Sequence, residues 1–148
     1  LEQNNINANP NLILKIDDSL DVENHLEILE KEIDLFFRAN PKIDGVFAVN
    51  ELYAVTAMKV ARKLGFSIPD DIQVIGFTDG VLSKHATPSL TTVSQHGQKI
   101  GEQAANLLID RLEAEDVETE EYFTNNNRKK DFIKVVIETE IIERESTK

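Results

Sequence analysis

Apolar residues form short continuous runs that are separated by longer stretches with helical spacing. The continuous runs at residues 12–16, 45–49 and 72–77 predict β-strands. Over residues 22–37 and 52–64, apolar positions recur every three or four residues, which predicts two helices. The order strand, helix, strand, helix, strand is typical of the α/β class. It predicts a Rossmann-like, doubly wound parallel sheet.

Capping residues indicate where these elements begin and end. Three aspartates and a serine at residues 17–21 are typical of a helix start, and Asn40-Pro41 is typical of a helix end. Asn50 follows the run at residues 45–49 and is a good N-cap for the second helix. Gly65 is well placed as the residue after that helix.

The second half of the chain departs from the simple alternation. The strand that ends at Phe77 leads into a polar loop, and then into a second β-like run at residues 90–93. A third helix is predicted over residues 97–112, with two glycines near its start. Residues 113–131 are acidic and then Asn-rich, which indicates a solvated connection. The β-branched alternation at residues 132–146 predicts a terminal strand or a bent pair of strands.

Composition narrows the class of protein. The 148 residues are 41% hydrophobic and 29% charged, as expected for a globular domain with a core. No apolar run approaches the roughly 18–20 residues of a membrane span. The net charge of −11 argues against unaided nucleic-acid binding, and the absence of cysteine excludes thiol chemistry and Cys-type zinc sites. The chain starts at Leu1 rather than Met, and we expect it to be a piece of a longer protein.

Motifs for catalysis are absent from the sequence. There is no phosphate-binding loop, no G-x-G-x-x-G and no G-x-S-x-G nucleophile elbow. His25, His85 and His96 are not spaced as metal ligands, and we interpret them as surface histidines. No nucleophile, base and oxyanion site come together, so we expect neither an enzyme nor a metal site.

Polar side chains follow two of the predicted strands. Asn50 and Glu51 come directly after the run at residues 45–49, and Thr78 and Asp79 come after Phe77. Carboxyl ends of parallel strands meet at one edge of a sheet, where ligands bind. These acceptors and donors suit the hydroxyls of a sugar. The local alternative is that Asn50 only caps a helix and Asp79 only belongs to a turn, and Asn50 could do both.

A series of motifs carries a resemblance to a known family. In chain order they are Asp44-Gly45-Val46-Phe47, Asn50-Glu51, Gly65-Phe66, Ile68-Pro69-Asp70-Asp71, Val74-Ile75-Gly76-Phe77, Thr87-Pro88-Ser89-Leu90-Thr91-Thr92-Val93 with Gln95, Gly101 and the ending Ile141-Ile142-Glu143-Arg144-Glu145-Ser146. Together they make the chain resemble the effector-binding domain of the LacI/GalR family of bacterial transcription regulators. The resemblance covers most of the chain.

The resemblance implies a periplasmic-binding-protein-like domain of two Rossmann-like lobes. Residues 1–148 would form part of it, without the family's N-terminal helix-turn-helix head. Residues 12–89 would belong to the C-terminal lobe, and residues 90–113 would be a crossover and a helix of the N-terminal lobe. Residues 132–148 would return to the C-terminal lobe. The strand at residues 72–77 would lead into another strand because the chain changes lobes.

The resemblance also implies ligand-binding residues. Asn50, Glu51, Thr78, Asp79 and Gln95 match or adjoin the family's ligand positions. Two positions depart from the family pattern. Glu51 stands where Asp is usual, and Thr78 stands where an Asp usually grips the ligand, which predicts a different set of ligands.

The implied function is that of an effector-sensing fragment of a cytoplasmic LacI-family regulator. Its partners would be a sugar or other small metabolite, DNA only through the absent head, and a second copy in a homodimer. No cofactor, metal or membrane is implied. We expect weak ligand affinity from this chain alone, because it carries one wall of the cleft. The alternative is a fragment of a periplasmic sugar-binding transport receptor.

Overall fold

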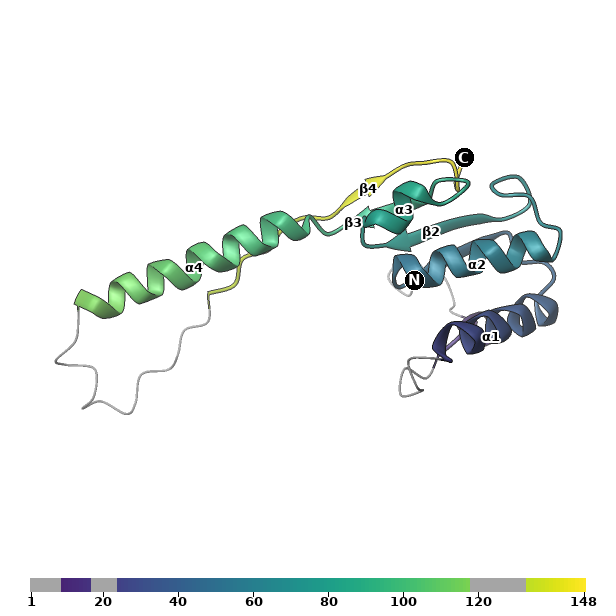
Figure 1. The fold of residues 1–148 in the computed structure, drawn as a ribbon, viewed down its shortest axis with the longest axis horizontal. Helices are drawn as coiled ribbons and strands as arrows, with labels where there is room; N and C mark the ends of the chain where they lie inside the picture. Colours follow the sequence, from purple (N-terminus) through teal and green to yellow (C-terminus); the bar gives the residue numbers. More distant parts are fainter. Residues whose placement is uncertain (1–8, 17–23, 118–132) are drawn as a thin grey trace. The chain divides into compact units, whose positions relative to one another are not determined.

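The computed structural model describes residues 9–16, 24–117 and 133–148. It has two compact units, residues 1–93 with 141–148 and residues 94–140, and each is described by itself. The elements, shown in Figure 1, are η2 (Pro10–Leu12), α1 (His25–Ala39), β1 (Gly45–Ala48), α2 (Glu51–Lys63), β2 (Gln73–Phe77), α3 (Val81–His85), β3 (Thr91–Ser94), α4 (Gly97–Val117) and β4 (Glu140–Ile142).

The four strands form one sheet in the order β1-β2-β3-β4. β1 runs parallel to β2, with Val46 beside Val74, and β2 runs parallel to β3, with Ile75 beside Thr91. The predicted α/β class with a parallel sheet is therefore confirmed. The run after the polar loop is a further parallel strand of this sheet.

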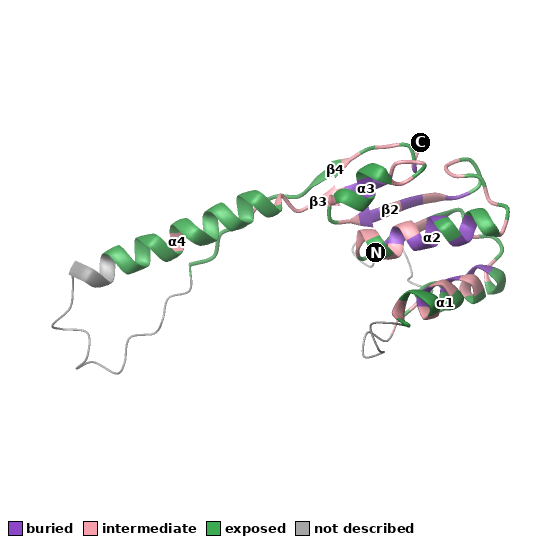
Figure 2. Ribbon diagram, viewed as in Figure 1, coloured by how far each residue is buried: buried purple, intermediate pink, exposed green. Residues whose placement is uncertain are grey.

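The core of the first unit lies between two helices and the sheet. Leu29, Ile33 and Phe37 recur every four residues along α1, so they share one face, and that face packs on α2. An adjoining part of α2 packs on the sheet through Ala54 and Met58. In Figure 2 these buried positions line the inner faces of α1, α2 and β2. This packing fixes the carboxyl ends of β1 and β2 relative to each other.

Both ends of α2 follow the predicted capping chemistry. Asn50 has an extended backbone, and its Oδ1 accepts a hydrogen bond from the Tyr53 amide at 2.8 Å. At the other end Gly65 has φ 92°, which any residue with a Cβ adopts at a cost. The amides of Gly65 and Phe66 donate to the carbonyls of Arg62 and Ala61. These bonds form a Schellman motif.

The strand predicted at residues 12–16 is wrong. Leu12 ends a single 3-10 turn that Pro10 begins and Asn9 caps, and residues 13–16 are not in a strand. An extended segment becomes a strand only through a ladder of hydrogen bonds with a neighbour, and no ladder involving residues 13–16 is formed in the part of the chain that is described. Leu14 and Ile16 instead pack against the core as single side chains.

Three other boundaries differ from the prediction. The polar loop after β2 contains the five-residue helix α3, which the pattern did not predict. α4 extends to Val117, past the predicted end at residue 112. In the predicted terminal strand at residues 132–146, only Glu140–Ile142 is a strand, and residue 132 lies outside the described residues. The helix-start residues 17–21 and most of the connection at residues 113–131 also lie outside them.

Candidate functional site

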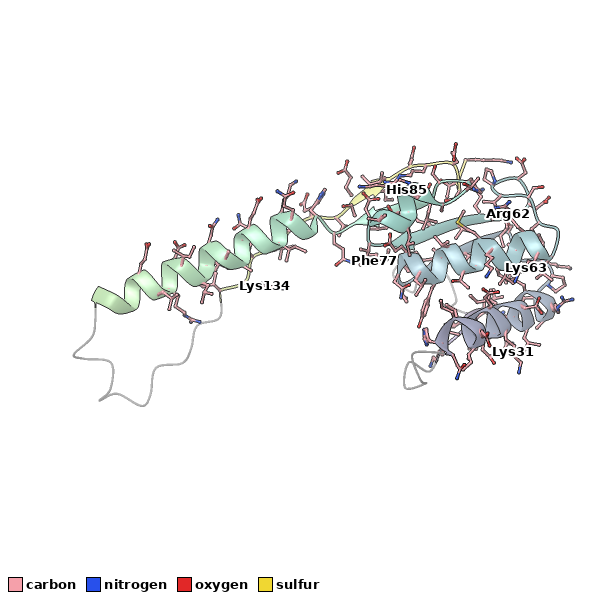
Figure 3. The ribbon with its side chains drawn as sticks, viewed as in Figure 1. Lys31, Arg62, Lys63, Phe77, His85 and Lys134 are labelled. Carbon is pink, nitrogen blue, oxygen red and sulfur yellow. The ribbon has the colours of Figure 1, made fainter. Side chains whose placement is uncertain are left out.

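The polar residues predicted at the strand ends follow two adjacent strands of the sheet. Ala48 at the end of β1 pairs with Gly76 of β2, so Asn50 and Thr78 follow neighbouring points of the sheet. Figure 3 labels Phe77, the last residue of β2, where the turn at residues 78–80 begins. We refer to residues 78–80 as the β2 turn.

Glu51 connects the end of β1 to the β2 turn. Its Oε2 accepts hydrogen bonds from the Gly80 amide at 3.0 Å, the Ser83 amide at 3.2 Å and the Ser83 hydroxyl at 2.8 Å. Gly80 and Ser83 stand at the start of α3, where backbone amides lack partners within the helix. The Glu51 carboxylate therefore caps α3 from a different element and holds the β2 turn against α2.

Gly80 is required by this close approach. A Cβ built at Gly80 would collide with both carboxylate oxygens of Glu51. The glycine lets the backbone of the β2 turn come within hydrogen-bond distance of Glu51.

Thr78 has an unusual backbone conformation. Its φ is 81°, in the left-handed region, which is strained for a β-branched residue. The Thr78 amide donates to the Val93 carbonyl at 3.0 Å, and its carbonyl accepts from the Ser83 hydroxyl at 3.5 Å. Strained residues of this kind persist where neighbouring contacts hold them, and they are concentrated at ligand sites.

Asp79 forms an ion pair inside the protein. Its Oδ1 accepts from Arg144 Nη2 at 2.5 Å and from the Thr92 hydroxyl at 3.1 Å, and Lys84 Nζ lies 3.7 Å from its Oδ2. Burial raises the pKa of Asp79, but the hydrogen bonds from Arg144 and Thr92 and the nearby positive charges lower it by more. The pKa therefore lies below the ordinary value of an aspartate.

The chain end holds this region together through two residues to which the sequence assigned no role. Ser146 is fully buried; its hydroxyl donates to the Val74 carbonyl at 2.6 Å and accepts from the Thr91 amide at 2.8 Å. Arg144 donates to the Leu90 carbonyl at 2.7 Å as well as to Asp79. The family motif at residues 141–146 was the signal in the sequence for these two residues, but the motif alone did not indicate which residues they contact.

The five predicted residues fall in both units. Thr78 and Asp79 belong to the β2 turn, Glu51 contacts it, and Asn50 precedes Glu51, whereas Gln95 follows β3 in the second unit. The helix cap predicted for Asn50 is confirmed. Glu51 and Asp79 both make internal contacts, and a ligand role for any of the five remains a prediction.

A large hollow of the first unit lies apart from these residues. A groove of about 1120 Å³ runs along β1 and is lined by residues 12–16, by α1 and by apolar side chains that include Val46 and Phe47. None of the predicted site residues lines it. Among the described residues, no group of three or more His, Cys, Asp or Glu side chains could hold a metal ion.

Residues 6–147 match the family of periplasmic binding protein-like domains. The chain belongs to this family. Since the match takes in nearly the whole sequence, both units are parts of such a domain.

The relatives of this domain include transcription regulators that bind sugars or control sugar operons. The HTH-type transcriptional regulator CelR of Thermobifida fusca is 33% identical over 72% of this chain, which spans 27% of CelR. The ribose operon repressor of Halalkalibacterium halodurans is 34% identical over 84% of this chain, and the chain spans 34% of it. A solved complex of the regulator CelR with cellobiose is similar to 90% of this chain, with a TM-score of 0.66 and 27% identity; the chain covers 37% of that structure. The chain thus spans about a third of the length of these relatives.

No described helix is long and apolar enough to cross a membrane.

Proposed function

We propose that this domain is the effector-sensing part of a LacI-family transcription regulator and that it binds a sugar at the β2 turn. One observation carries the proposal: regulators of this type align with most of the chain, and one of them forms a complex with cellobiose. The regulator would act in the cytoplasm. It would not catalyse a reaction, and it would bind DNA through a separate head, which fits a chain with a net charge of −11.

The geometry supports the β2 turn as the sugar site. The Thr78 backbone is held in a strained conformation by its bonds to Val93 and Ser83, which fixes the point at the carboxyl end of β2 from which its side chain projects. A hydroxyl in place of a carboxylate donates as well as accepts, which suits a neutral ligand with many hydroxyls. A sugar bound here would close a second lobe over the turn and change the geometry of the attached head.

The site proposal is tested by cellobiose titration of the complete gene product. Thr78→Val removes one hydroxyl and keeps the shape, so we expect calorimetry to show an affinity about tenfold lower. The control is Thr56→Val, because the hydroxyl of Thr56 donates to the Leu52 carbonyl inside α2. An equal affinity in wild type and Thr78→Val would contradict the site.

A fragment of a periplasmic sugar-binding transport receptor is the second candidate, since the fold alone would serve both functions. The curated relatives named above are regulators, which favours the first candidate. An upstream helix-turn-helix in the gene would support the regulator, and a signal peptide would support the receptor.

We also propose a homodimer. Four large apolar side chains of α4 are 44–58% exposed: Ile100, Leu108, Ile109 and Leu112. Apolar surface of this kind is often covered by another chain. Light scattering should show self-association of the 148-residue chain, and a strictly monomeric folded species would contradict this.

A further inference from the structure

Arg144 connects three segments that are far apart in the sequence. It lies after β4, and its guanidinium is 15% exposed. Nη2 donates to Asp79 of the β2 turn at 2.5 Å, and Nη1 donates to the Leu90 carbonyl at 2.7 Å and to the Thr92 hydroxyl at 3.3 Å. The planar guanidinium therefore spans from the β2 turn to β3.

The backbone around Arg144 is fixed on the same strand. The Arg144 amide donates to the Thr91 hydroxyl at 2.8 Å, and its carbonyl accepts from the same hydroxyl at 3.1 Å. Two residues later, the buried Ser146 is bonded to β2 and β3. Because the backbone of Arg144 and that of Ser146 are both held, the guanidinium approaches Asp79 from a rigid support.

Other elements also hold the β2 turn. On one side, Glu51 holds Gly80 and Ser83, and the Thr78 amide is bonded to Val93. On the other side, Asp79 is held by Arg144, by Thr92 and at 3.7 Å by Lys84, whose side chain is 57% exposed. Of the two positive charges near Asp79, Arg144 is the closer and the less exposed, so we expect it to contribute most to the orientation of Asp79.

We propose that Arg144 is a positioning residue for the effector site: through Asp79 it keeps the β2 turn in the conformation that presents Thr78, and it couples that turn to β3. The reference to an effector rests on the proposed function. The coupling itself is a property of this chain and is measured without any ligand.

The test is amide hydrogen exchange of the chain. We expect Arg144→Gln to raise the exchange rates of the Thr78, Gly80 and Ser83 amides about tenfold, the effect of losing a charged hydrogen bond. The amides of the α1–α2 core should keep their rates. Rates at the turn within about twofold of wild type would overturn the proposal.

A double-mutant cycle separates positioning through Asp79 from a purely structural role. If Arg144 acts through Asp79, then Asp79→Asn gives the same local increase, and adding Arg144→Gln gives no further increase. Additive effects would show that Arg144 acts independently of Asp79 and would overturn the proposal. If Arg144→Gln does not fold, Asp79→Asn alone decides, since it removes the same ion pair.

The chain contains a matched control. Asp34 and Arg38 form an ion pair at 2.6 Å on the surface of α1, with side chains 35% and 63% exposed. Arg38→Gln should leave exchange at the β2 turn unchanged, because that pair contacts neither the turn nor β3.

A titration with cellobiose then distinguishes the two proposals. In the complete gene product, Arg144→Gln should weaken cellobiose binding about tenfold, in step with the exchange at the turn. If the wild-type protein does not bind cellobiose, the proposed function fails for that sugar, while the exchange rates still decide the role of Arg144. If it binds and Arg144→Gln binds equally well, the positioning role is overturned.

Discussion

The helices α2 and α4 have similar apolar spacing and very different surroundings. In α2, six residues are buried: Ala54, Thr56, Ala57, Met58, Val60 and Ala61. In α4, no described side chain is buried, and Leu107 alone is even half-buried (Figure 2). Periodicity therefore predicts that a segment is a helix and which face is apolar, but it does not predict what covers that face. The packed pair α1–α2 and the exposed α4 offer matched substitutions.

The largest difference is expected for leucine truncation. Leu29→Ala on α1 removes a side chain with no exposed surface that packs against α2 and should lower the free energy of unfolding by about 2–5 kcal/mol. Leu108→Ala on α4, where the side chain is 58% exposed, should change the free energy of unfolding by less than about 0.5 kcal/mol at a chain concentration too low for self-association. Urea unfolding of both variants measures this. Equal losses would show that α4 is covered in solution.

Ser146→Ala should have the next largest effect. It leaves the Val74 carbonyl and the Thr91 amide without a partner in the interior, which should lower the free energy of unfolding by about 1–3 kcal/mol. Ser67→Ala on the surface is the control. A loss equal to that of the control would mean that Ser146 is not buried between β2 and β3.

Alanine substitutions at two glycines should change stability in opposite directions. Gly65→Ala forces a Cβ into φ 92° and should destabilise the first unit by about 1–2 kcal/mol. Gly101→Ala has open space for a Cβ inside α4 and should stabilise that helix by about 0.5–1 kcal/mol. Thermal unfolding followed by circular dichroism measures both. A Gly65→Ala variant as stable as wild type would contradict the Schellman motif.

The smallest effect concerns pH and salt. The folded-state pKa of Asp79 is lowered, so its stabilisation is present above the unfolded pKa of about 4 and is lost as the pH falls through the folded value. Asp79→Asn should therefore reduce stability at pH 7 and have little effect at pH 2.

Adding about 1 M salt should cancel the effect of Asp34→Asn on the exposed pair and leave most of that of Asp79→Asn. Equal salt sensitivity of the two pairs would contradict the burial of Arg144.

Sequence patterns correctly predicted helices whose apolar faces are buried in this chain and caps that form within a few residues. The apolar spacing of α1 and α2 was confirmed because both faces are buried, and the caps at Asn50 and Gly65 were confirmed because a cap involves only neighbouring residues. α3 was missed because it has five residues and its two apolar side chains, Val81 and Leu82, are exposed. Residues 13–16 were wrongly predicted as a strand because a strand requires a neighbour that the pattern cannot supply.

A ligand role for the polar residues at the strand ends remains a prediction. Parallel pairing predicted that Glu51 lies near the residues that follow Phe77, and Glu51 does contact Gly80. The contacts that define their roles join residues far apart, 29 positions for Glu51 with Gly80 and 65 for Asp79 with Arg144. Spacing along the chain carries no information about such pairs.

The central claim is that the β2 turn is the effector site of a regulator. The most direct test is amide hydrogen exchange of the complete gene product with and without saturating cellobiose. We expect slower amide exchange at residues 50–51 and 78–80 when cellobiose is present, and no change on the exposed face of α1. Slower exchange confined to the groove along β1, at residues 12–16 and 45–49, would contradict this claim and assign the ligand to that groove.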